Sequence, residues 1–512
     1  MPQVNNKRIA KNTIILYFRT IITVFISLFT SRLILLLLGV DDYGINSAVA
    51  GVIAMFGVVS GSLSSSISRF ITFELGHGDF IKLNKIFSTA INIQLIIGLL
   101  ILILGETIGV WFLNTQMNIP DGRMVAANWV LQCALFSFFI GLTQIPYTAC
   151  IIGHEKMTAF AWFSVVESVL RLVIVYMLYF SPIDKLIFYS ILGLIVTTLI
   201  RVAQMIYCNM HFSECHYKFT FERALVKEMT GFAGWSFLTN TSWIFNTQGV
   251  SILINIFFGV AINAARGLAA SIEGVVIKFC NDFMTAINPQ ITKSYAAGEI
   301  NEMNNLICRG AKYSYYLLLV TSLPLVFEAH TVLKLWLGQV PDYTVTFFRL
   351  TFVFSLIQNL GSTGYTGCMA TGNIKWYTII ITSVGFLVFP LTWFLFELGY
   401  PVETTYYVSI IIYSILVVIR LFIMRYLWGF PIFMFFSRVI YPIFVVTTLS
   451  LILPGVLYCY MEHGIIKTIL VILTSITSGL IVIYSFGLNS NERKIFSDRA
   501  KIITNKYIKT KR

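Results

Sequence analysis

Long apolar stretches separated by short polar breaks run along the whole chain. Stretches such as LILLLLG at residues 33–39 and IIGLLILI at residues 96–103 do not alternate apolar and polar positions, so they do not fit the strands of a membrane β-barrel. A bilayer core about 30 Å thick takes about 20 apolar helical residues per crossing. The pattern therefore predicts an all-α, polytopic membrane protein with about fourteen transmembrane helices, near residues 12–38, 44–67, 86–113, 125–151, 159–181, 185–210, 231–258, 264–291, 312–336, 344–370, 376–398, 404–428, 436–460 and 465–487.

Composition supports a membrane protein and leaves no room for a separate soluble domain. Of the 512 residues, 57% are hydrophobic and 12% are charged, with a mean hydropathy of +0.80, whereas soluble domains carry about 25% charged residues. The first apolar segment is long and has no small-residue cleavage site, so we expect it to be retained as the first helix. The eight cysteines show no framework spacing, so disulfides are not expected.

Lys and Arg gather in alternate connections between the apolar segments, and this asymmetry sets the orientation. One set of connections holds most of them, including Lys7, Arg69, Lys156, Lys375 and the tail NERKIFSDRAKIITNKYIKTKR. Both termini are therefore predicted to be cytoplasmic. We attribute the net charge of +13 to this topology and to contact with anionic membrane lipids, and not to nucleic-acid binding. The other set of connections holds only Arg123, Lys185, Arg266, Lys334 and Lys467.

Several phrases occur twice, which indicates an internal repeat. YTACIIGHEK at residues 147–156 returns as YTGCMATGNIK at residues 365–375, 218 positions later. LLLLGVDDYGINSA around Gly39 returns as NIFFGVAINAA around Gly259, and GDFIKLNKIF from Gly78 returns as GEINEMNNLI from Gly298, both 220 positions later. Chance similarity between hydrophobic segments is the alternative, but these anchors lie in loops and helix ends. Three ordered anchors at nearly one offset predict a duplicated unit of six helices.

The even number of helices in the repeat fixes how the two copies relate. After six crossings the second copy enters the membrane in the same orientation as the first, and parallel copies with a substrate path between them are one arrangement that transporters use. The predicted organisation is an N-terminal six-helix lobe at residues 1–212, a C-terminal six-helix lobe at 221–430, helices 13 and 14 at 431–488 and a basic cytoplasmic tail at 489–512.

Polar residues inside the membrane are costly and usually face a cavity or a partner. The fifth predicted helix carries Glu167 and Arg171, four residues apart with the acid first, which is the favourable order for an ion pair on one helix face. This pair fits a lining or coupling role and a structural lock equally well. By rise per residue, Arg171 and Lys278 both fall near mid-bilayer. The remaining candidates are Arg19 and Arg32 in the first helix, Asn240, Asn246, Gln248 and Asn255 in the seventh, and Glu273, Lys278 and Asp282 in the eighth.

The stretch CNMHFSECH at residues 208–216 holds two Cys and two His, all of them residue types that bind zinc. Its spacing matches no common structural zinc motif. The sequence therefore favours an ordinary helix end at this point. Neither a metal nor a cofactor is expected.

Six phrases, most of which overlap the repeated ones, carry a resemblance to a known family: SRLILLLLGVDDYGINSAVAG, TACIIGHEKM, NIFFGVAINAARGLA, AINPQITKSYAAGE, LKLWLGQVPDYT and ATGNIKWY. Over its whole length the chain resembles the Wzx-type polysaccharide transporters, which share the multidrug/oligosaccharidyl-lipid/polysaccharide (MOP) exporter superfamily with the multidrug and toxic-compound extruders. The resemblance implies two six-helix lobes with two extra helices in the bacterial inner membrane. It also implies alternating access, coupling to H⁺ or Na⁺, and flipping of a lipid-linked oligosaccharide for O-antigen, lipopolysaccharide or capsule synthesis beside other polysaccharide-assembly proteins.

No invariant family motif assigns roles to single residues here, so the candidate roles rest on depth and charge. We expect cations to hold a pyrophosphate, since Arg suits bidentate phosphate contact, and carboxylates to relay the coupling ion. The substrate-binding candidates are Arg19, Arg32, Arg171, Lys278, Asn240, Asn246, Gln248 and Asn255, and the ion-coupling candidates are Glu167, Glu273 and Asp282. Asn and Gln at such positions also bond neighbouring helices.

Two other functions compete with a flippase. A multidrug or toxin cation antiporter of the same superfamily would prefer acidic over basic cavity residues, and the mixture of charges here argues against it. A membrane polysaccharide polymerase or ligase would be expected to present a sizeable external catalytic loop. The external connections, such as NTQMNIPDGRM and LGQVPDYT, are short and hold no paired nucleophile and base. A transporter that is not an enzyme is therefore the favoured prediction.

Overall fold

The computed structural model describes residues 6–115, 119, 122–220, 222–337, 340–462, 464–489 and 492–493. Every regular element within these ranges is a helix, which confirms the all-α class. Most of the basic tail predicted at 489–512 lies outside the described residues.

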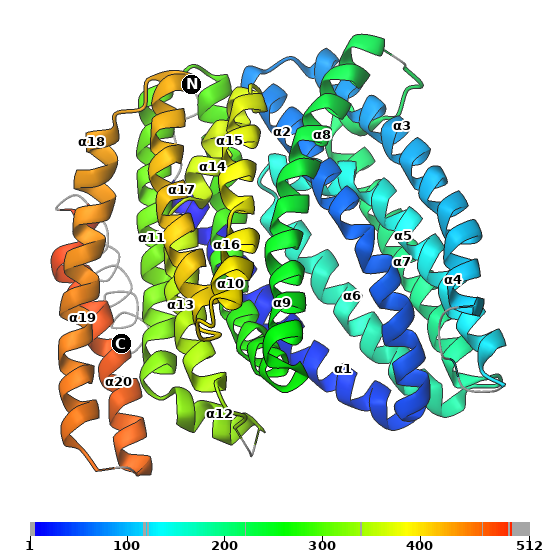
Figure 1. Ribbon diagram of the computed structural model, residues 1–512. Coiled ribbons are helices and arrows are strands. Elements are labelled where there is room, and N and C mark those ends of the chain that lie inside the picture. The colour runs from blue at the N-terminus through cyan, green and yellow to red at the C-terminus, as the bar shows by residue number, and fades with distance from the viewer. Residues whose placement is uncertain are drawn as a thin grey trace, which may run out of the picture. The chain divides into compact units, whose positions relative to one another are not determined.

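The helices follow one another along the chain with short connections (Figure 1). Up to the end of the first predicted lobe they are α1 (Asn6–Met55), α2 (Gly57–His77), α3 (Phe80–Leu104), η1 (Gly105–Gly109), α4 (Val110–Thr115), α5 (Met124–Gly153), α6 (Met157–Met177), η2 (Leu178–Phe180), α7 (Lys185–His211) and η3 (Ser213–Cys215). The later helices are α8 (Arg223–Ile244), η4 (Phe245–Gly249), α9 (Val250–Phe258), α10 (Val260–Ala296), α11 (Ile300–Phe327), α12 (Ala329–Leu337), α13 (Thr344–Asn359), α14 (Ser362–Thr371), α15 (Lys375–Phe386), α16 (Val388–Glu397), α17 (Thr404–Trp428), α18 (Ile432–Phe435), η5 (Phe436–Ile440), α19 (Tyr441–Tyr460), α20 (Ile465–Val482) and η6 (Ile483–Gly487).

Length and composition identify nine helical stretches among the described residues that can cross a membrane, or ten if α11 and α12, bent by 80° from each other, form one span. The helical stretches outside this set include α2, the run formed by α8, η4 and α9, the separate helix α10, and the pair α13 and α14. These helices carry more polar side chains; α10 alone contains Glu273, Lys278, Asp282 and Lys293. The count of fourteen helices stays a prediction.

Two sharp bends recur at the repeat offset. Inside α1 the backbone leaves the helical region at Gly39, with φ 82° and ψ 174°, and α9 ends at Gly259 with φ 88° and ψ 173°. The two glycines are 220 positions apart, as in the sequence repeat. Asn84 and Asn304 are also 220 positions apart, and each hydrogen bonds residues at or just after the end of a later helix. Asn84 donates to the carbonyls of Glu214 and His216, which follow α7, and Asn304 accepts from Trp428, the last residue of α17.

The bend at Gly39 also corrects one predicted boundary. The sequence places a helix at 44–67, whereas the structure continues α1 from the bend to Met55 and, after a single break at Phe56, continues as α2 to His77. The apolar pattern ends earlier because the last turns of α2 carry polar residues such as Arg69 and Glu74.

The described chain divides into two compact units. Unit 1 comprises residues 1–244, 282–303 and 366–382, and unit 2 comprises residues 245–281, 304–365 and 383–512. These units do not follow the predicted lobes at 1–212 and 221–430, which stay a prediction.

In unit 1, α5 lies at the centre of the helix packing. It contacts α2, α3 and α7, while α1 packs against α6 and α2 packs against α8; Figure 1 shows α3, α5 and α7 as neighbours. One apolar cluster includes Leu131 and Leu135 of α5 with Ile45 and Val49 of the second part of α1. Burial of these side chains stabilises the bent path of α1, because each buried aliphatic side chain contributes about 1.5–3 kcal/mol.

In unit 2, α13 and α16 both pack against α17, and α19 lies beside α20 (Figure 1). Tyr315 of α11 hydrogen bonds Thr447 of α19. Two basic residues from the connections predicted to be external are engaged by the protein. Arg266 donates to Ser251 Oγ at 2.5 Å, and Lys467 is buried with its Nζ 4.2 Å from the ring centroid of Tyr458.

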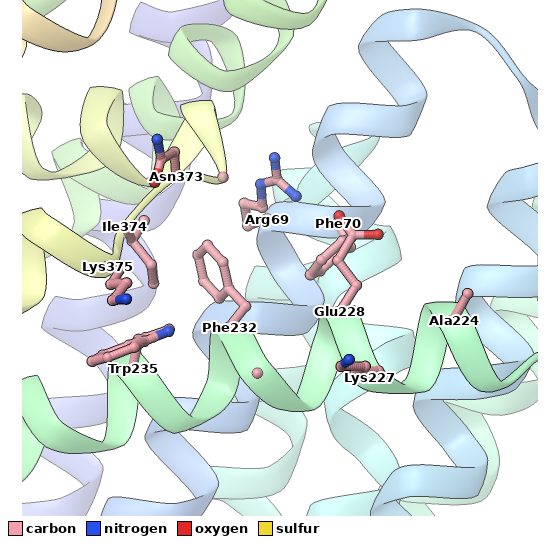
Figure 2. Close-up of a pocket in the computed structure, with 12 residues that line it drawn as sticks. Arg69, Phe70, Ala224, Lys227, Glu228, Phe232, Trp235, Asn373, Ile374 and Lys375 are labelled. Carbon is pink, nitrogen blue, oxygen red and sulfur yellow. The ribbon is translucent and has the colours of Figure 1, made fainter.

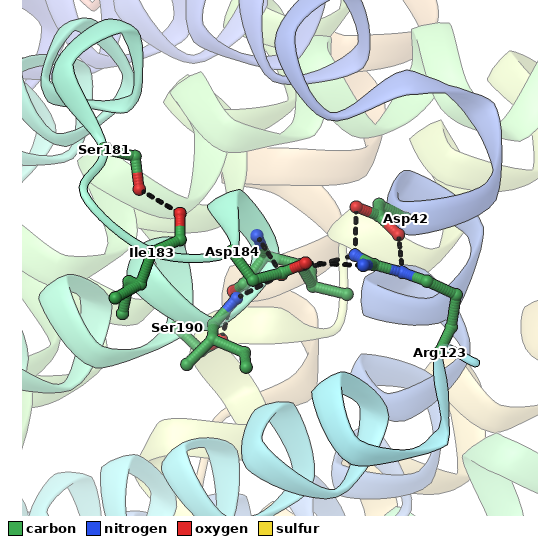
Figure 3. Close-up of polar contacts among 8 residues, drawn as sticks. Asp42, Arg123, Ser181, Ile183, Asp184 and Ser190 are labelled. Carbon is green, nitrogen blue, oxygen red and sulfur yellow. Dashed lines mark hydrogen bonds and ion pairs between the residues drawn. The ribbon is translucent and has the colours of Figure 1, made fainter.

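A carboxylate pair in unit 1 holds Arg123, the first residue before α5 (Figure 3). Its guanidinium forms a two-pronged contact with Asp42, at 2.8 and 2.5 Å, and lies 2.5 Å from Asp184. Hydrogen bonds to Asp184 and Asp42 outweigh burial and raise the pKa of Arg123. Burial opposes ionisation of Asp184, but the bonds from Arg123 and from two backbone amides at the start of α7 lower its pKa. This cluster joins α1, α5 and α7.

The low pKa of Asp184 predicts acid sensitivity. A carboxylate whose folded-state pKa lies below its unfolded value of about 3.9 stabilises the fold above that pH, and the stabilisation is lost as the pH falls through the folded pKa. The Asp184→Asn variant keeps the helix cap but loses the ion pair. We expect it to lower the melting temperature of the purified protein by about 1–3 °C at neutral pH and to flatten the acid-dependent loss.

The matched control is Asp79→Asn. Asp79 caps α3 through the amides of Ile81 and Lys82 in the same way as Asp184 caps α7, without the contact to Arg123. Thermal unfolding of both variants between about pH 3 and pH 8 measures the difference. Equal behaviour of the two variants would show that the Arg123 contact adds no stability.

Candidate functional site

The first polar contact of interest lies between α1 and the second half of α10, inside unit 1. Arg19 forms an ion pair with Asp282, and Thr20 donates a hydrogen bond to the same carboxylate. The guanidinium of Arg19 also lies over the ring of Phe160, 5.0 Å from its centroid. The side chains of Arg19 and Asp282 are only 17% and 6% exposed. A charge this buried requires its partner, because an unpaired buried charge is strongly destabilising.

A second ionic contact links the same two helices through Arg8, eleven residues before Arg19 in α1, and Lys293, eleven residues after Asp282 in α10. Glu155, at the turn between α5 and α6, is buried and bonds Lys293 at 2.9 Å, Gln290 at 3.1 Å and Arg8 at 3.1 Å. Between the two ionic contacts lies a small apolar core of Leu16, Met157 and Ala286. Together these contacts form the seam between α1 and α10.

A second seam joins α2 and α8 and uses equivalent positions. Asn240 donates to Ser62 Oγ at 2.9 Å. Asn240 stands 220 positions after Thr20, and Ser62 stands 220 positions before Asp282. Ser66 Oγ donates to the carbonyl of Met229 at 3.0 Å. The two seams therefore each have a side-chain hydrogen bond at positions related by the 220-residue offset, and at these four positions only the first seam carries charge.

A pocket of about 510 Å³ opens next to the α2 and α8 seam (Figure 2). It is lined by three segments, which are α2, α8 and the turn between α14 and α15. Figure 2 shows Phe232 and Trp235 projecting from α8 toward the turn at residues 373–375. Its cations are Arg69, Lys227 and Lys375, and its acid is Glu228.

Arg69 is held in place at the wall of this pocket. Its Nη2 donates to the carbonyl of Ala370 at 3.3 Å, and its guanidinium lies over Phe70 and Phe232, 4.7 and 5.6 Å from the ring centroids. The Nε of Arg69 is buried with no hydrogen-bond partner among the described residues. Lys227 and Lys375 are exposed. The pocket thus combines one fixed and two accessible cations with aromatic faces.

A second pocket, of about 490 Å³, lies at the other copy of the repeated turn. Its lining includes Arg8 and Lys156. Arg8 stands 219 positions before Lys227 of the first pocket, and Lys156 stands 219 positions before Lys375. Each copy of the phrase that opens with Tyr and Thr therefore contributes to a basic pocket, together with the start of α1 in one case and of α8 in the other.

The other predicted site residues either contact a neighbouring residue or are exposed. Arg171 bonds Glu167 at 2.8 Å, with side chains 49% and 35% exposed. Asn246 donates to the carbonyl of Gly385, and Glu273 accepts from Ser355 Oγ at 2.5 Å. Arg171 belongs to unit 1 and Lys278 to unit 2, so their joint role stays a prediction. Exposed side chains are those of Arg32, Gln248, Asn255 and Lys278.

Sequence reasoning missed several residues of the seams and pockets. It assigned Arg19 to the substrate and Asp282 to ion coupling, roles that stay predictions, but it did not foresee the ion pair that joins them. It treated Arg69, Lys293 and Lys375 only as topology signals. The signal that could have found Lys293 and Lys375 was their position inside the family-like stretch AINPQITKSYAAGE and the repeated phrase YTGCMATGNIK, whereas neither kind of phrase includes Arg69.

The described part of the chain holds nine helical stretches able to cross a membrane, or ten with the bent pair α11 and α12, which defines a multi-pass membrane protein. No family model matches the chain. It is 20% identical over 321 residues to the uncharacterized membrane protein EpsK of Bacillus subtilis (strain 168), and the match spans 62% of this chain and 63% of the length of EpsK.

Solved structures are similar over most of the chain. A MATE transporter in the straight conformation superposes with a TM-score of 0.70, and an outward-facing multidrug resistance MATE transporter of the MOP superfamily with 0.71. A MOP superfamily transporter from Pyrococcus furiosus, for which a reverse polarity of the binding pocket suggests a different function, gives 0.70. Each is 14% identical and covers 82% of this chain and 95% of its own. The chain therefore has the fold of MATE transporters.

Proposed function

We propose that the protein flips a polyprenyl-pyrophosphate-linked oligosaccharide from the cytoplasmic to the outer leaflet of a bacterial inner membrane, for O-antigen or capsule synthesis. The observation that carries the proposal is the pocket with Arg69, Lys227 and Lys375 beside Phe232 and Trp235. Such a substrate has an anionic head that needs cations and a glycan that cannot cross hydrocarbon unaided. Its apolar tail can stay in the lipid, so only the head and glycan need a protected path.

The two seams provide a way to open and close that path. Each joins a helix of the proposed N-terminal lobe, α1 or α2, with a helix of the proposed C-terminal lobe, α10 or α8. If both termini are cytoplasmic, as we propose, the seams and both basic pockets lie in the cytoplasmic half of the membrane. Breaking both seams would admit the head group, and re-forming them would release it outward, which is alternating access.

Asp282 is the proposed coupling acid. When it binds H⁺, or Na⁺ replaces the guanidinium beside it, Arg19 loses its partner and becomes available to the anionic substrate. A ligand shifts a two-state equilibrium only by its differential affinity for the two states. An acid whose partner changes between states meets this requirement, and the uncharged equivalent pair Asn240 and Ser62 does not.

The multidrug antiporter remains the second candidate because the chain shares its fold with MATE transporters. A cationic drug is repelled by a pocket that holds three cations and one acid, since clefts lined by one sign of charge concentrate the opposite ion. The basic pocket therefore favours an anionic substrate. A transporter fold also argues against the polymerase or ligase alternative.

The Lys227→Gln, Lys375→Gln double variant tests the proposal. Both side chains are exposed, so their loss should leave folding intact while removing two attractions to the head group. We expect export of surface glycan in a strain lacking its own copy to fall about tenfold, from the loss of two charge-assisted contacts. Binding of a purified polyprenyl pyrophosphate to the detergent-purified protein should weaken in parallel.

The control is the double variant Lys218→Gln, Arg223→Gln, which removes the same charge from exposed positions that line neither pocket. Normal export and binding in the pocket variant would refute an anionic substrate at this site. A rise in sensitivity to cationic drugs, with unchanged glycan, would favour the antiporter.

A further inference from the structure

Three thiols and a carboxylate gather where α5, α7 and η3 meet in unit 1. The Sγ atoms of Cys150 and Cys215 and a carboxylate oxygen of Glu214 all lie within 4.8 Å of one another. The thiol of Cys208 contacts that of Cys215, and Cys215 in turn contacts Cys150. All three cysteines are fully buried, and Glu214 is 2% exposed. None of these cysteines forms a disulfide.

Four such donors match the needs of a tetrahedral zinc ion. Zinc prefers thiolate ligands at about 2.3 Å, and structural sites are closed by four protein ligands. Tetrahedral geometry at that bond length puts neighbouring sulfurs about 3.8 Å apart. The ligand atoms of Cys150, Cys215 and Glu214, already within 4.8 Å of one another, need to approach by at most about 1 Å, and Cys208 joins them through its contact with Cys215. We propose that Cys150, Cys208, Cys215 and Glu214 bind one zinc ion.

The surroundings of the four donors supply an independent observation. Three thiolates, one carboxylate and Zn²⁺ carry a net charge of −2, which a buried site must balance. Arg201 lies close enough to interact electrostatically with Cys208. Its buried Nη1 has no hydrogen-bond partner among the described residues, although its Nε donates to Thr143. An arginine with an unused donor beside the thiols fits a site that becomes anionic.

His154 adds a second supporting contact. Its Nε2 lies 2.5 Å from Glu214 Oε1, and the ring stacks on Phe212 at 4.2 Å between centroids. A hydrogen bond from an outer residue to a ligating carboxylate is the usual way in which a metal ligand is oriented. The thiol of Cys208 contacts the carbonyl of Tyr147 at 3.6 Å, and it would turn from this carbonyl toward the ion.

Sequence spacing missed this site because its ligands come from separate elements. CNMHFSECH suggests two Cys and two His as ligands, but the structure selects Cys208, Glu214 and Cys215 from that stretch and adds Cys150 from α5. His211 and His216 instead bond carbonyls of their own turns. A zinc ion here would tie the end of α5 to the chain that leaves α7 and continues toward α8.

The test uses the full chain, purified in detergent without chelators. We expect about one zinc per chain by elemental mass spectrometry, and removal of the zinc should lower the melting temperature, because metal-binding free energy becomes folding free energy. Replacing zinc by Co²⁺ should give the strong d–d absorption of a tetrahedral site with a thiolate-to-cobalt charge-transfer band. This spectrum reports the ligands of the unaltered protein directly.

The Cys215→Ser variant should lose most of the bound metal. The Cys133→Ser variant should retain it, because Cys133 is a buried cysteine of α5 that is not among the proposed ligands. Three results would overturn the proposal: a metal-free protein that takes up neither zinc nor cobalt, a Cys215→Ser variant that binds as much metal as the unaltered chain, or a Cys150–Cys215 disulfide in protein from intact cells. The outcome does not depend on the transported substrate.

Discussion

Replacing Asp282 by Asn is expected to reduce export of the surface glycan at least about tenfold for the same amount of folded protein in the membrane. Asn keeps an acceptor for Thr20 and nearly the same volume, but it removes the charge that holds Arg19. The variant therefore imitates the protonated acid and leaves no group to respond to the ion gradient. The measurement is glycan export in a deletion strain, beside the membrane level of the protein.

Two comparisons make the Asp282 result specific. Ser62→Ala removes the hydrogen bond at the equivalent position of the other seam, without changing charge, and we expect a loss of less than about twofold. Adding Arg19→Gln to Asp282→Asn removes the buried charge left by the single change. If the single variant fails only because an unpaired Arg19 unfolds the protein, the double variant should restore the protein level and export together.

Recovery of the protein level without recovery of export would identify the ion pair as part of transport. Normal export in Asp282→Asn itself would exclude Asp282 as the coupling acid. It would leave the pair as a structural contact between α1 and α10.

The helices could be predicted because they depend on local features of the sequence, whereas the duplicated unit stays a prediction. An apolar run of about 20 residues is sufficient to predict a crossing, and Glu167 with Arg171 requires only helix geometry, so this pair is found at 2.8 Å as the spacing suggests. Gly39 and Gly259 share one unusual backbone conformation. Hydrophobicity and charge do not predict this conformation, but the place of both glycines in a repeated phrase is consistent with it.

The tertiary contacts could not be predicted in the same way. Arg19 and Asp282 are 263 positions apart, and depth in the membrane alone does not say which of several charges meet. The sequence placed Asp282 four residues from Lys278, a reasonable partner on one helix, but packing of α1 against α10 gives Asp282 to Arg19 instead. The pocket cations were missed because the rule that predicts topology gives the same explanation for every Lys and Arg in the connections predicted to be cytoplasmic.

Gly39 and Gly259 are expected to resist substitution strongly. Their φ values near +85° with extended ψ fall in a region that is nearly restricted to glycine, and forcing another residue into it costs about 1–3 kcal/mol. A Cβ at either position would have no atom within 4 Å, so Gly→Ala measures backbone strain without a clash. We expect each alanine variant to lower the melting temperature of the purified protein by several degrees and to reduce its level in the membrane.

Gly141→Ala provides the matched control, because Gly141 lies inside α5 with helical φ and a Cβ added there would also have no atom within 4 Å. Alanine there should stabilise the helix by up to about 1 kcal/mol. If the two bends are equivalent parts of a duplicated unit, Gly39→Ala and Gly259→Ala should destabilise by similar amounts. The bend at Gly39 directs the chain toward Asp42 and its contact with Arg123. A large effect at Gly39 with none at Gly259 would therefore show that this local contact, and not the repeat, requires the glycine.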